Sequence, residues 1–339
     1  MPELRADDFD YELPSSLIAQ HPPTQRDGGR LLMLGRDDGT VAHRWIRELP
    51  GLLPREALLV VNDSRVIPAR LAARRHSGGR VELMLLEDLG DGVWAAMVRS
   101  SSRLRAGERL PLIVGERDVG EHAALLDSPV QGRCRLRLPS GALPRWGNVP
   151  LPPYIERAPD EQDRTRYQTV YAAVDGSVAA PTAGLHLSDA LLLALHQAGV
   201  ELARLTLHVG PGTFVPVRSE RVDAHRMEAE RYAIPEETAA QIAGARGAGR
   251  PVVAVGTTCV RALEASGGRA GSGRTELFIR PGYGFRVVDG LLTNFHLPRS
   301  TLLMLVCAFA GRDRVLGAYR QAVAEGYRFY SYGDAMLLL

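Results

Sequence analysis

The sequence predicts an α/β protein whose main domain is a mixed sheet with helices on both faces, a three-layer arrangement, and whose middle carries an inserted, small all-β, barrel-like domain. Strand and helix signals alternate on both sides of a central region, and that region shows only short strands between turn signals. The length of 339 residues is sufficient for two domains. We therefore expect residues 1–68 and 149–339 to form the main domain and residues 69–148 to form the insertion.

Hydrophobic patterns and end signals place the elements of the main domain. Ser188 is typical of a helix N-cap, and Gly199 follows the expected end of the same helix. The Gly/Ser-rich segment 266–273 is expected to be a loop. Helices are expected at 189–198, 235–248, 259–265, 300–310 and 313–325, and strands at 57–61, 200–209, 252–255, 276–280 and 285–294.

The strand pattern of the inserted region is typical of a small barrel or sandwich. Strands are expected at 80–87, 93–98, 109–114 and 133–138, and the last of these alternates basic and apolar residues. Residues 65–150 contain 14 arginines and 9 acidic residues. This excess is a weak indication of phosphate binding, and a solvated barrel face is the favoured interpretation on that evidence alone.

Composition excludes several classes of chemistry. Hydrophobic residues at 45% and charged residues at 24% are globular proportions. The sequence contains no lysine, so its 41 basic residues are all arginine. A Schiff-base lysine, a lysine general base and a phosphate-loop lysine are therefore excluded. Any cationic recognition must use guanidinium groups, which suit carboxylates and phosphates but do not act as bases.

The cysteines and the N-terminus predict a reducing, cytoplasmic location. Cys134, Cys259 and Cys307 are scattered and odd in number, which favours neither a disulfide framework nor a structural zinc site. The first residues are acidic, unlike a signal peptide, and the apolar run 301–310 is too short to span a bilayer. No membrane association is expected.

Glycine-containing turns are candidate ligand cradles. The turn after the strand 200–209 has two glycines of a dinucleotide fingerprint, but Val215 and Pro216 follow, so neither a helix nor a Rossmann site is expected there. The segment Gly256–Thr258 joins a buried strand to a helix start and is a candidate anion site, or else an ordinary strand–helix connection. The loop 181–186 is a third candidate.

Four histidines lie at junctions between expected elements and are candidate acids or bases: His186, His208, His225 and His296. None has the local spacing of a metal site, so no metal is expected. Cys259, at a helix start, could act as a nucleophile, although a small buried residue is the simpler interpretation.

Beyond these patterns, the sequence resembles one family nearly end to end, most weakly over about 88–148. The matching segments, in order, are 10–14, 62–70, 150–154, 167–171, 179–186, 207–214, 255–258, 293–298 and 332–336. They are similar to the S-adenosylmethionine:tRNA ribosyltransferase-isomerases of queuosine biosynthesis. So many long motifs in the same order make a chance similarity improbable.

The resemblance implies an unusual use of S-adenosylmethionine, as a ribosyl donor that is consumed as a co-substrate. The ribose is transferred to 7-aminomethyl-7-deazaguanine at the wobble position of a tRNA with a queuosine-type anticodon and is rearranged to give epoxyqueuosine, with release of adenine and methionine. The family implies no metal or redox cofactor, a monomer, and an α/β domain with an inserted β-barrel.

This chemistry needs a base for a C5′ proton next to the sulfonium and an acid for the departing adenine. We expect the proton-transfer pair among four residues: His186, His225, Glu230 and His296. The glycine turns 210–214 and 256–258 are expected to cradle the adenosyl group and the methionine carboxylate. We expect Arg65 and Arg70, with Asn62, to bind the tRNA or the carboxylate. The other expected substrate-binding residues are Thr182, Gly184, His208, Gly210, Gly212, Thr213, Phe214, Gly256, Thr257, Thr258, Asn294 and Asp334.

Two other classes remain open at this stage. A non-catalytic tRNA-binding module would bind tRNA without releasing adenine, and a metal hydrolase would contain zinc and respond to chelators. Analysis of the products from S-adenosylmethionine and tRNA separates all three.

Overall fold

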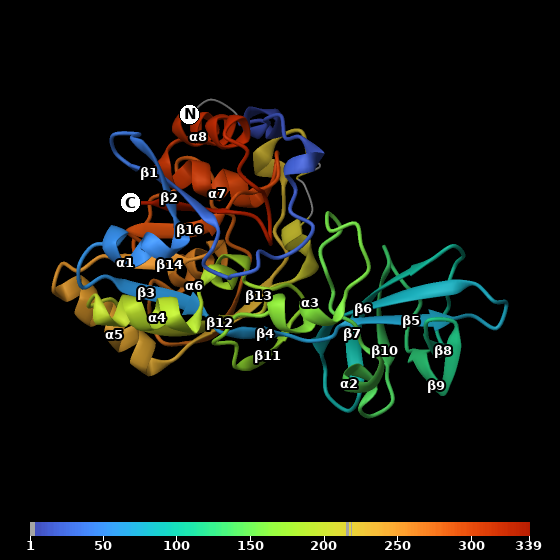
Figure 1. Cartoon of the computed structure of the whole chain (residues 1–339). Coiled ribbons are helices and arrows are strands. Elements are labelled where there is room, and N and C mark those ends of the chain that lie inside the picture. The colour runs from blue at the N-terminus through green and yellow to red at the C-terminus, as the bar shows by residue number, and fades with distance from the viewer. Residues whose placement is uncertain (1–3, 215–216, 218) are drawn as a thin grey trace.

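A mixed sheet forms the centre of the main body (Figure 1). The structure, a computed structural model, describes residues 4–214, 217 and 219–339. Pairing is parallel through β12, β3, β14 and β16 and between β17 and β1, and is antiparallel elsewhere. The strand order is β15 (Gly271–Thr275), β13 (Glu230–Ile234), β12 (Glu201–Leu207), β3 (Leu58–Asn62), β14 (Val252–Val255), β16 (Gly290–Asn294), β17 (Ala335–Leu338), β1 (Arg30–Leu34) and β2 (Val41–Trp45).

The central strand β3 shows why the body has three layers. All of its residues are buried, and successive side chains of a strand point to opposite faces of the sheet. Leu58 and Val60 pack in one hydrophobic cluster, whereas Leu59 and Val61 pack in another. A strand that is apolar on both faces needs helices on both faces.

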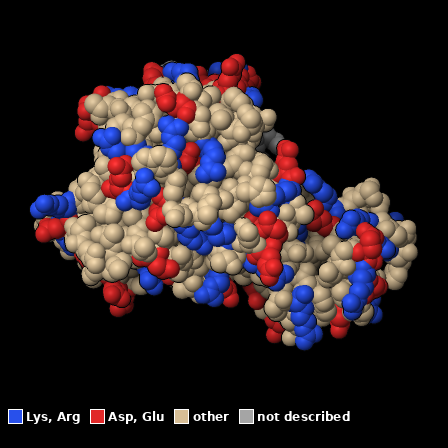
Figure 2. All heavy atoms as spheres, in the orientation of Figure 1, with Lys and Arg blue, Asp and Glu red and all other residues tan. Residues whose placement is uncertain are grey.

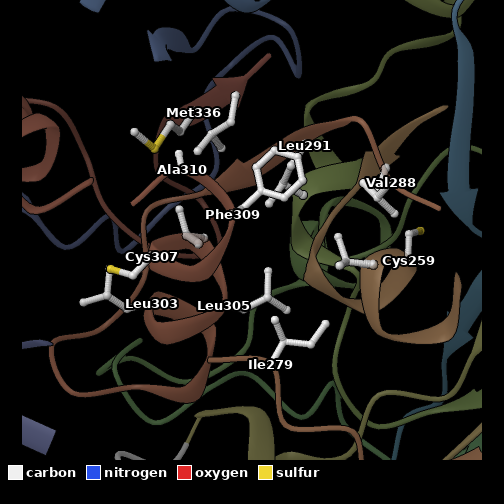
Figure 3. Packing of buried hydrophobic residues seen from close by; sticks show 14 of the residues in the cluster. Cys259, Ile279, Val288, Leu291, Leu303, Leu305, Cys307, Phe309, Ala310 and Met336 are labelled. Carbon is white, nitrogen blue, oxygen red and sulfur yellow. The ribbon is translucent and has the colours of Figure 1, made fainter. Parts of the chain in front are cut away.

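The two clusters are built from different helices. One side of the sheet packs against α5 (Glu236–Gly247), α6 (Thr257–Ser266), α7 (Thr301–Ala310) and α8 (Arg312–Ala324). The other packs against α1 (Leu49–Leu52) and α4 (Asp189–Gln197). Figure 3 shows part of the first cluster, to which Leu305 and Phe309 of α7, Leu291 of β16 and Val288 all belong. The predicted three-layer α/β architecture is confirmed.

Local end signals were dependable predictors of the helices. Ser188 and Ser300 cap α4 and α7, because their hydroxyls accept hydrogen bonds from the backbone N–H groups of Leu191 and Leu303, at 3.0 and 3.2 Å. Gly199 follows α4 with a φ of +85°, which favours glycine. Short 3-10 helices occur at η1 (Ala6–Phe9), η2 (Ser15–Leu17), η3 (Ile46–Glu48), η4 (Thr182–His186), η5 (Pro211–Phe214) and η6 (Val222–Ala224).

A closed antiparallel barrel projects from one end of the body (Figure 1). Around the barrel the strands are β10 (Arg133–Arg137), β7 (Val93–Ser100), β6 (Arg80–Asp88), β5 (Arg70–Arg74), β8 (Arg109–Val114) and β9 (Arg117–Leu125). The predicted strands correspond to β6, β7, β8 and β10. The alternation predicted for β10 is also confirmed: Cys134 and Leu136 are buried, and Arg133, Arg135 and Arg137 are exposed. The domain boundaries themselves stay a prediction.

A buried ion pair between Arg157 and Asp163 stabilises one of the segments that join the barrel to the body. These segments contain β4 (Ser64–Val66) and β11 (Val174–Ser177), which pair with each other, and α2 (Ala142–Trp146) and α3 (Glu161–Arg166). Asp163 accepts hydrogen bonds from the Arg157 guanidinium at 2.6 and 2.8 Å and from the Tyr332 hydroxyl at 2.7 Å. The segment after the barrel is thereby held against the C-terminal part of the chain.

Two sequence-based expectations were wrong. No strand forms at 276–280; the edge strand β15 lies earlier, at Gly271–Thr275, inside the Gly/Ser-rich segment that was expected to be a loop. Its pairing with β13 outweighs the low strand propensity of glycine and serine. The turn after β12 contains the short 3-10 helix η5, and the expectation that no helix starts at Val215 and Pro216 lies outside the described residues. Among the described residues, no helix combines the length and the apolar character needed to cross a membrane.

Candidate active site

The ends of neighbouring parallel strands bring the predicted site segments together. β12, β3, β14 and β16 run in the same direction, so their carboxyl ends meet at one edge of the sheet. His208 follows β12, Gly256 follows β14, and Asn294 ends β16. Ligands of open α/β sheets bind at this edge. Two adjoining cavities lie there.

The first cavity, which we call the inner pocket, is narrow. It is lined by Ala180–Ala183, Gly256–Thr258, Thr293–Leu297 and the aromatic rings of Tyr154 and Tyr330, and its volume is about 50 Å³. That volume suffices for a few water molecules or one small polar group.

The second cavity, which we call the interdomain cleft, has a volume of about 640 Å³. Leu86, Glu87, Ala95 and Arg133 of the barrel line one side, and the segments 208–212 and 225–231 of the body line the other. Cavities of this size accommodate nucleoside-sized ligands. Val209 lines both cavities, so the inner pocket and the cleft are neighbouring parts of one region.

The start of α6 supplies backbone donors to the inner pocket. Gly256 has a φ of +89°, which turns the chain sharply from β14 into the helix. Thr257 and Thr258 form the first turn and line the pocket, where the first N–H groups of a helix lack helical partners. The predicted anion cradle at Gly256–Thr258 therefore faces a cavity.

Asn294 presents an unpartnered acceptor at the same pocket. Its side chain is 2% exposed. The Nδ2 atom lies 2.9 Å from Nε2 of His186 and donates to the Tyr330 carbonyl at 3.0 Å. The Oδ1 atom is buried and has no hydrogen-bond partner in the structure. A buried carbonyl oxygen in this state is poised for a ligand N–H group.

His186 and His296 are buried in different positions. His296 lines the inner pocket, and its Nε2 atom lies 2.8 Å from the Thr293 hydroxyl. His186 does not line either cavity, but it contacts Asn294, which lines the inner pocket. Burial lowers the pKa of His296 to about 3; burial, and secondarily the charge of Arg328, lowers that of His186 to about 4. Both rings are therefore neutral at pH 7.

We expect these two histidines to make the protein less stable as the pH falls below about 6.5. The unfolded chain binds their protons at a pKa near 6.5 and the folded chain only near 4 and 3, so acid favours unfolding over this window. Each histidine contributes a slope of up to about 1.4 kcal/mol per pH unit. The free energy of unfolding, measured with urea at several pH values between 7 and 5, should fall less steeply with decreasing pH for His296→Gln than for the parent. His196→Gln, at an exposed position of α4, is the control. Equal slopes for the parent and His296→Gln would contradict this account.

The interdomain cleft contains the other candidate base. His225 is half-buried at the cleft, where its ring meets the edge of Phe278 with centroids 5.4 Å apart. Partial burial lowers its pKa. His208 also lines the cleft; burial and the nearby Arg231 lower its pKa, and its Nδ1 atom has no hydrogen-bond partner in the structure. Both histidines are thus suited to accept protons at neutral pH.

Glu230 shapes the glycine turn of the cleft. One carboxylate oxygen accepts from the Gly210 N–H at 3.1 Å, and the other accepts from the Arg261 guanidinium. Arg261 also donates to the Leu277 carbonyl at 3.1 Å. Gly212 lies under Glu228, whose Cδ would be 3.0 Å from a Cβ at that position. The side chains of Thr213 and Phe214 lie outside the described residues.

Several predicted binding residues are engaged in the scaffold instead. Asn62 bonds the backbone of Leu207 through both side-chain atoms. A Cβ on Gly184 would lie 2.1 Å from the Tyr171 hydroxyl, so close packing requires glycine there. Asp334 accepts from the backbone N–H groups of Arg30 and Arg328 at 2.8 and 2.7 Å.

The two predicted arginines lie outside both cavities. Arg65 is paired with Asp175 at 3.4 Å, and Arg70 with Glu82 at 3.2 Å. Thr182 does line the inner pocket. Cys259 is fully buried in the core, where burial raises its pKa strongly, which argues against a nucleophilic thiolate.

Sequence reasoning missed the barrel's share of the site. Glu87 and Arg133 line the cleft, and so does Glu228 of the body. Each is a common charged residue in an ordinary polar stretch, and no local pattern distinguishes it. Across the described parts of the chain, no group of three or more His, Cys, Asp or Glu side chains is arranged to hold a metal ion.

The chain is thus a three-layer α/β body with a closed barrel inserted after its first strands. The interdomain cleft lies between these two parts, and the inner pocket lies in the body beside it. The chain belongs to the queuosine biosynthesis protein family, whose model matches residues 6–338. The resemblance noted from the sequence motifs is confirmed.

The similar proteins cover essentially the whole chain. An S-adenosylmethionine:tRNA ribosyltransferase-isomerase of Anaeromyxobacter sp. (strain Fw109-5) is 54% identical over 347 residues, 99% of each chain. Its counterpart in Rubrobacter xylanophilus is 52% identical over 340 residues, 99% of this chain and 98% of that one. The crystal structure of an S-adenosylmethionine tRNA ribosyltransferase from Thermotoga maritima is 38% identical, covers 98% of this chain and 100% of its own, and gives a TM-score of 0.56.

Proposed function

We propose that this protein transfers the ribosyl moiety of S-adenosylmethionine to 7-aminomethyl-7-deazaguanine at the tRNA wobble position and isomerises it, giving epoxyqueuosine, adenine and methionine. Full-length relatives with this activity in their names support the assignment. The structural observation that carries it is the nucleoside-sized interdomain cleft that adjoins a small polar pocket at Val209. A two-substrate reaction with a zwitterionic donor needs both compartments.

The inner pocket suits the charged groups of the donor's methionyl end, and its volume of about 50 Å³ admits one small polar group rather than the whole methionyl chain. The N–H groups at the start of α6 suit the carboxylate, and the unpartnered Oδ1 of Asn294 suits the ammonium group. The rings of Tyr154 and Tyr330, with centroids 4.5 Å apart, line the pocket and favour a nearby sulfonium cation. We assign the adenosyl group to the glycine turn at Gly210–Gly212 in the cleft.

His225 is the base that we propose for the C5′ proton. It reaches the cleft, and its lowered pKa keeps the ring neutral at pH 7. Once it has taken the proton, the imidazolium is an acid for the departing adenine. His296, in the inner pocket, is the second candidate. His186 contacts Asn294 and does not reach a cavity, so we propose that it positions Asn294. Glu230 is bonded to Arg261 and to the Gly210 N–H, so we propose that it positions the glycine turn.

The remaining assignments follow the family resemblance. We propose that the enzyme needs no cofactor, with S-adenosylmethionine as a consumed co-substrate, and that it works as a cytoplasmic monomer on tRNAs with a queuosine-type anticodon. We also propose that residues 69–148 are an inserted domain, with residues 1–68 and 149–339 as the main domain. Sedimentation measurements would test the monomer, and comparison of tRNAs with other anticodons would test the specificity.

Product analysis tests the function directly. The protein is incubated with S-adenosylmethionine and tRNA that carries 7-aminomethyl-7-deazaguanine. We expect free adenine, free methionine and a nucleoside whose mass has risen by the rearranged pentose. Binding of tRNA without adenine release would indicate a non-catalytic module, and a methylated nucleoside would refute the proposed ribosyl transfer.

A further inference from the structure

Four arginines line the interdomain cleft, one from the barrel and three from the body. Arg133 belongs to β10, Arg226 follows η6, Arg231 belongs to β13 and Arg274 belongs to β15. We call this set the arginine rim. We propose that the arginine rim binds the phosphate backbone of the RNA around the reacting nucleotide, and that Glu87 and Glu228 occupy it in the free protein. This inference rests on the proposed function, because it places the RNA substrate at the same cleft.

Like charges face each other within the rim. Arg231 and Arg274 are direct partners in the antiparallel pairing of β13 with β15. Two arginines opposite each other repel and destabilise a sheet unless an anion lies between them. In this structure the anion is Glu87 of the barrel, whose carboxylate lies 3.3 Å from Arg231 and 3.1 Å from Arg274. A β-bulge in β6, between Leu85 and Glu87, shifts the register just before this residue.

A second ion pair crosses the cleft with the opposite polarity. Arg133 of the barrel pairs with Glu228 of the body. Both side chains are about half exposed, at 46% and 50%, so the pair is weakly held and exchangeable. Glu228 also lies over Gly212, in the turn that we assign to the adenosyl group.

The charges of the cleft leave room for an anion. Arg226 is exposed and forms no ion pair with any residue that the structure describes. Glu230, which also lines the cleft, is bonded to the buried Arg261, and Glu276 is the remaining acidic residue in the lining. The Glu87 carboxylate is therefore shared by Arg231 and Arg274, whereas Arg226 has no carboxylate partner among the described residues. Figure 2 shows charged side chains of both signs interspersed where the barrel meets the body.

Phosphate oxygens can replace the two carboxylates on these arginines. The guanidinium group binds phosphate and carboxylate with the same paired geometry, and RNA backbone contacts are made largely by such groups. Glu87 and Glu228 would then turn to solvent, which uncovers the glycine turn. Binding of RNA would thus open the place that the donor needs.

The test measures binding of a synthetic RNA hairpin with a tRNA anticodon loop to the full chain. Relative to the parent, R231Q/R274Q should weaken binding about 10-fold at low salt, and each lost phosphate contact should reduce the slope of log K against log[salt] by about 0.7. E228Q should strengthen binding, because the internal competitor is removed. R246Q/R320Q, on the exposed faces of α5 and α8 and outside the cleft lining, is the matched control and should bind as the parent does. Thermal unfolding checks that every variant is folded.

Each contrary result would overturn the proposal. Binding of the hairpin by R231Q/R274Q with the affinity of the parent would refute the proposal, and a loss of affinity without a change in salt slope would indicate a contact other than phosphate. An equal loss in R246Q/R320Q would indicate nonspecific attraction, and weaker binding by E228Q would mean that the carboxylate is not a competitor. The proposed function is tested separately. If the hairpin results are as expected but the parent makes no epoxyqueuosine, the arginine rim is supported as an RNA-binding site and the proposed reaction is refuted.

Discussion

Glu230→Leu is expected to destabilise the folded protein by about 3–5 kcal/mol. The side chains of Glu230 and Arg261 are 7% and 4% exposed, so the substitution leaves a guanidinium buried without its carboxylate. Arg261 would keep its hydrogen bonds to the Leu277 and Thr275 carbonyls, which do not neutralise its charge. The N–H of Gly210 would also lose its acceptor.

Urea unfolding monitored by circular dichroism measures this loss. The matched control is Glu116→Leu, which breaks a barrel ion pair with Arg74 whose glutamate is 75% exposed and should cost less than about 1 kcal/mol. In the double variant E230L/R261M an apolar pair replaces the ion pair, and most of the lost stability should return. Similar free energies of unfolding for Glu230→Leu and Glu116→Leu would show that the buried ion pair stabilises the fold no more than the exposed one.

His225→Ala is expected to lower kcat by about 10²–10⁴-fold, the usual contribution of a general base. The imidazole makes a T-shaped contact with Phe278 and is not part of the hydrophobic core, so the fold should survive the substitution. His196→Ala, at an exposed position on α4, removes a histidine remote from both cavities and should leave kcat unchanged. Release of adenine from S-adenosylmethionine in the presence of substrate tRNA is the measurement.

The pH profile of the parent enzyme provides a second check on His225. A base works only when it is deprotonated, so the rate should fall as the pH falls through the pKa of His225. Since partial burial lowers that pKa, the acid limb should lie below pH 6.5. A variant His225→Ala that retains the turnover and acid limb of the parent would transfer the role to His296 or His208.

The parts of the fold that could be predicted are those that depend on neighbours in the sequence. The hydroxyls of Ser188 and Ser300 cap helices by bonding residues three positions ahead, and the apolar run at β3 is visible without its partners. β15 was misplaced because its Gly-Ser-Gly sequence carries no strand signal and becomes a strand only by pairing with β13.

The same division applies to the site. Family motifs and strand ends identified Gly256–Thr258 and Asn294, and a position between expected elements identified His225; all of these line the cavities. The ion pairs across the cleft join residues that are 95 positions apart for Arg133 and Glu228 and 187 apart for Arg274 and Glu87. No local pattern encodes such a distance. The scaffold role of Asn62 was hidden for the same reason, since its partner Leu207 lies 145 positions away.

The position of β17 in the main sheet has a consequence for biosynthesis. This strand, at residues 335–338, is inserted between β16 and β1, so the N-terminal hairpin of β1 and β2 joins the sheet only through it. The barrel strands, in contrast, are contiguous between residues 70 and 137. During translation the barrel can close while the rest is still being made, whereas β1 gains its partner β17 only after residues 335–338 have been made. Until then one edge of β1 lacks its partner strand, and an unpaired strand edge favours aggregation.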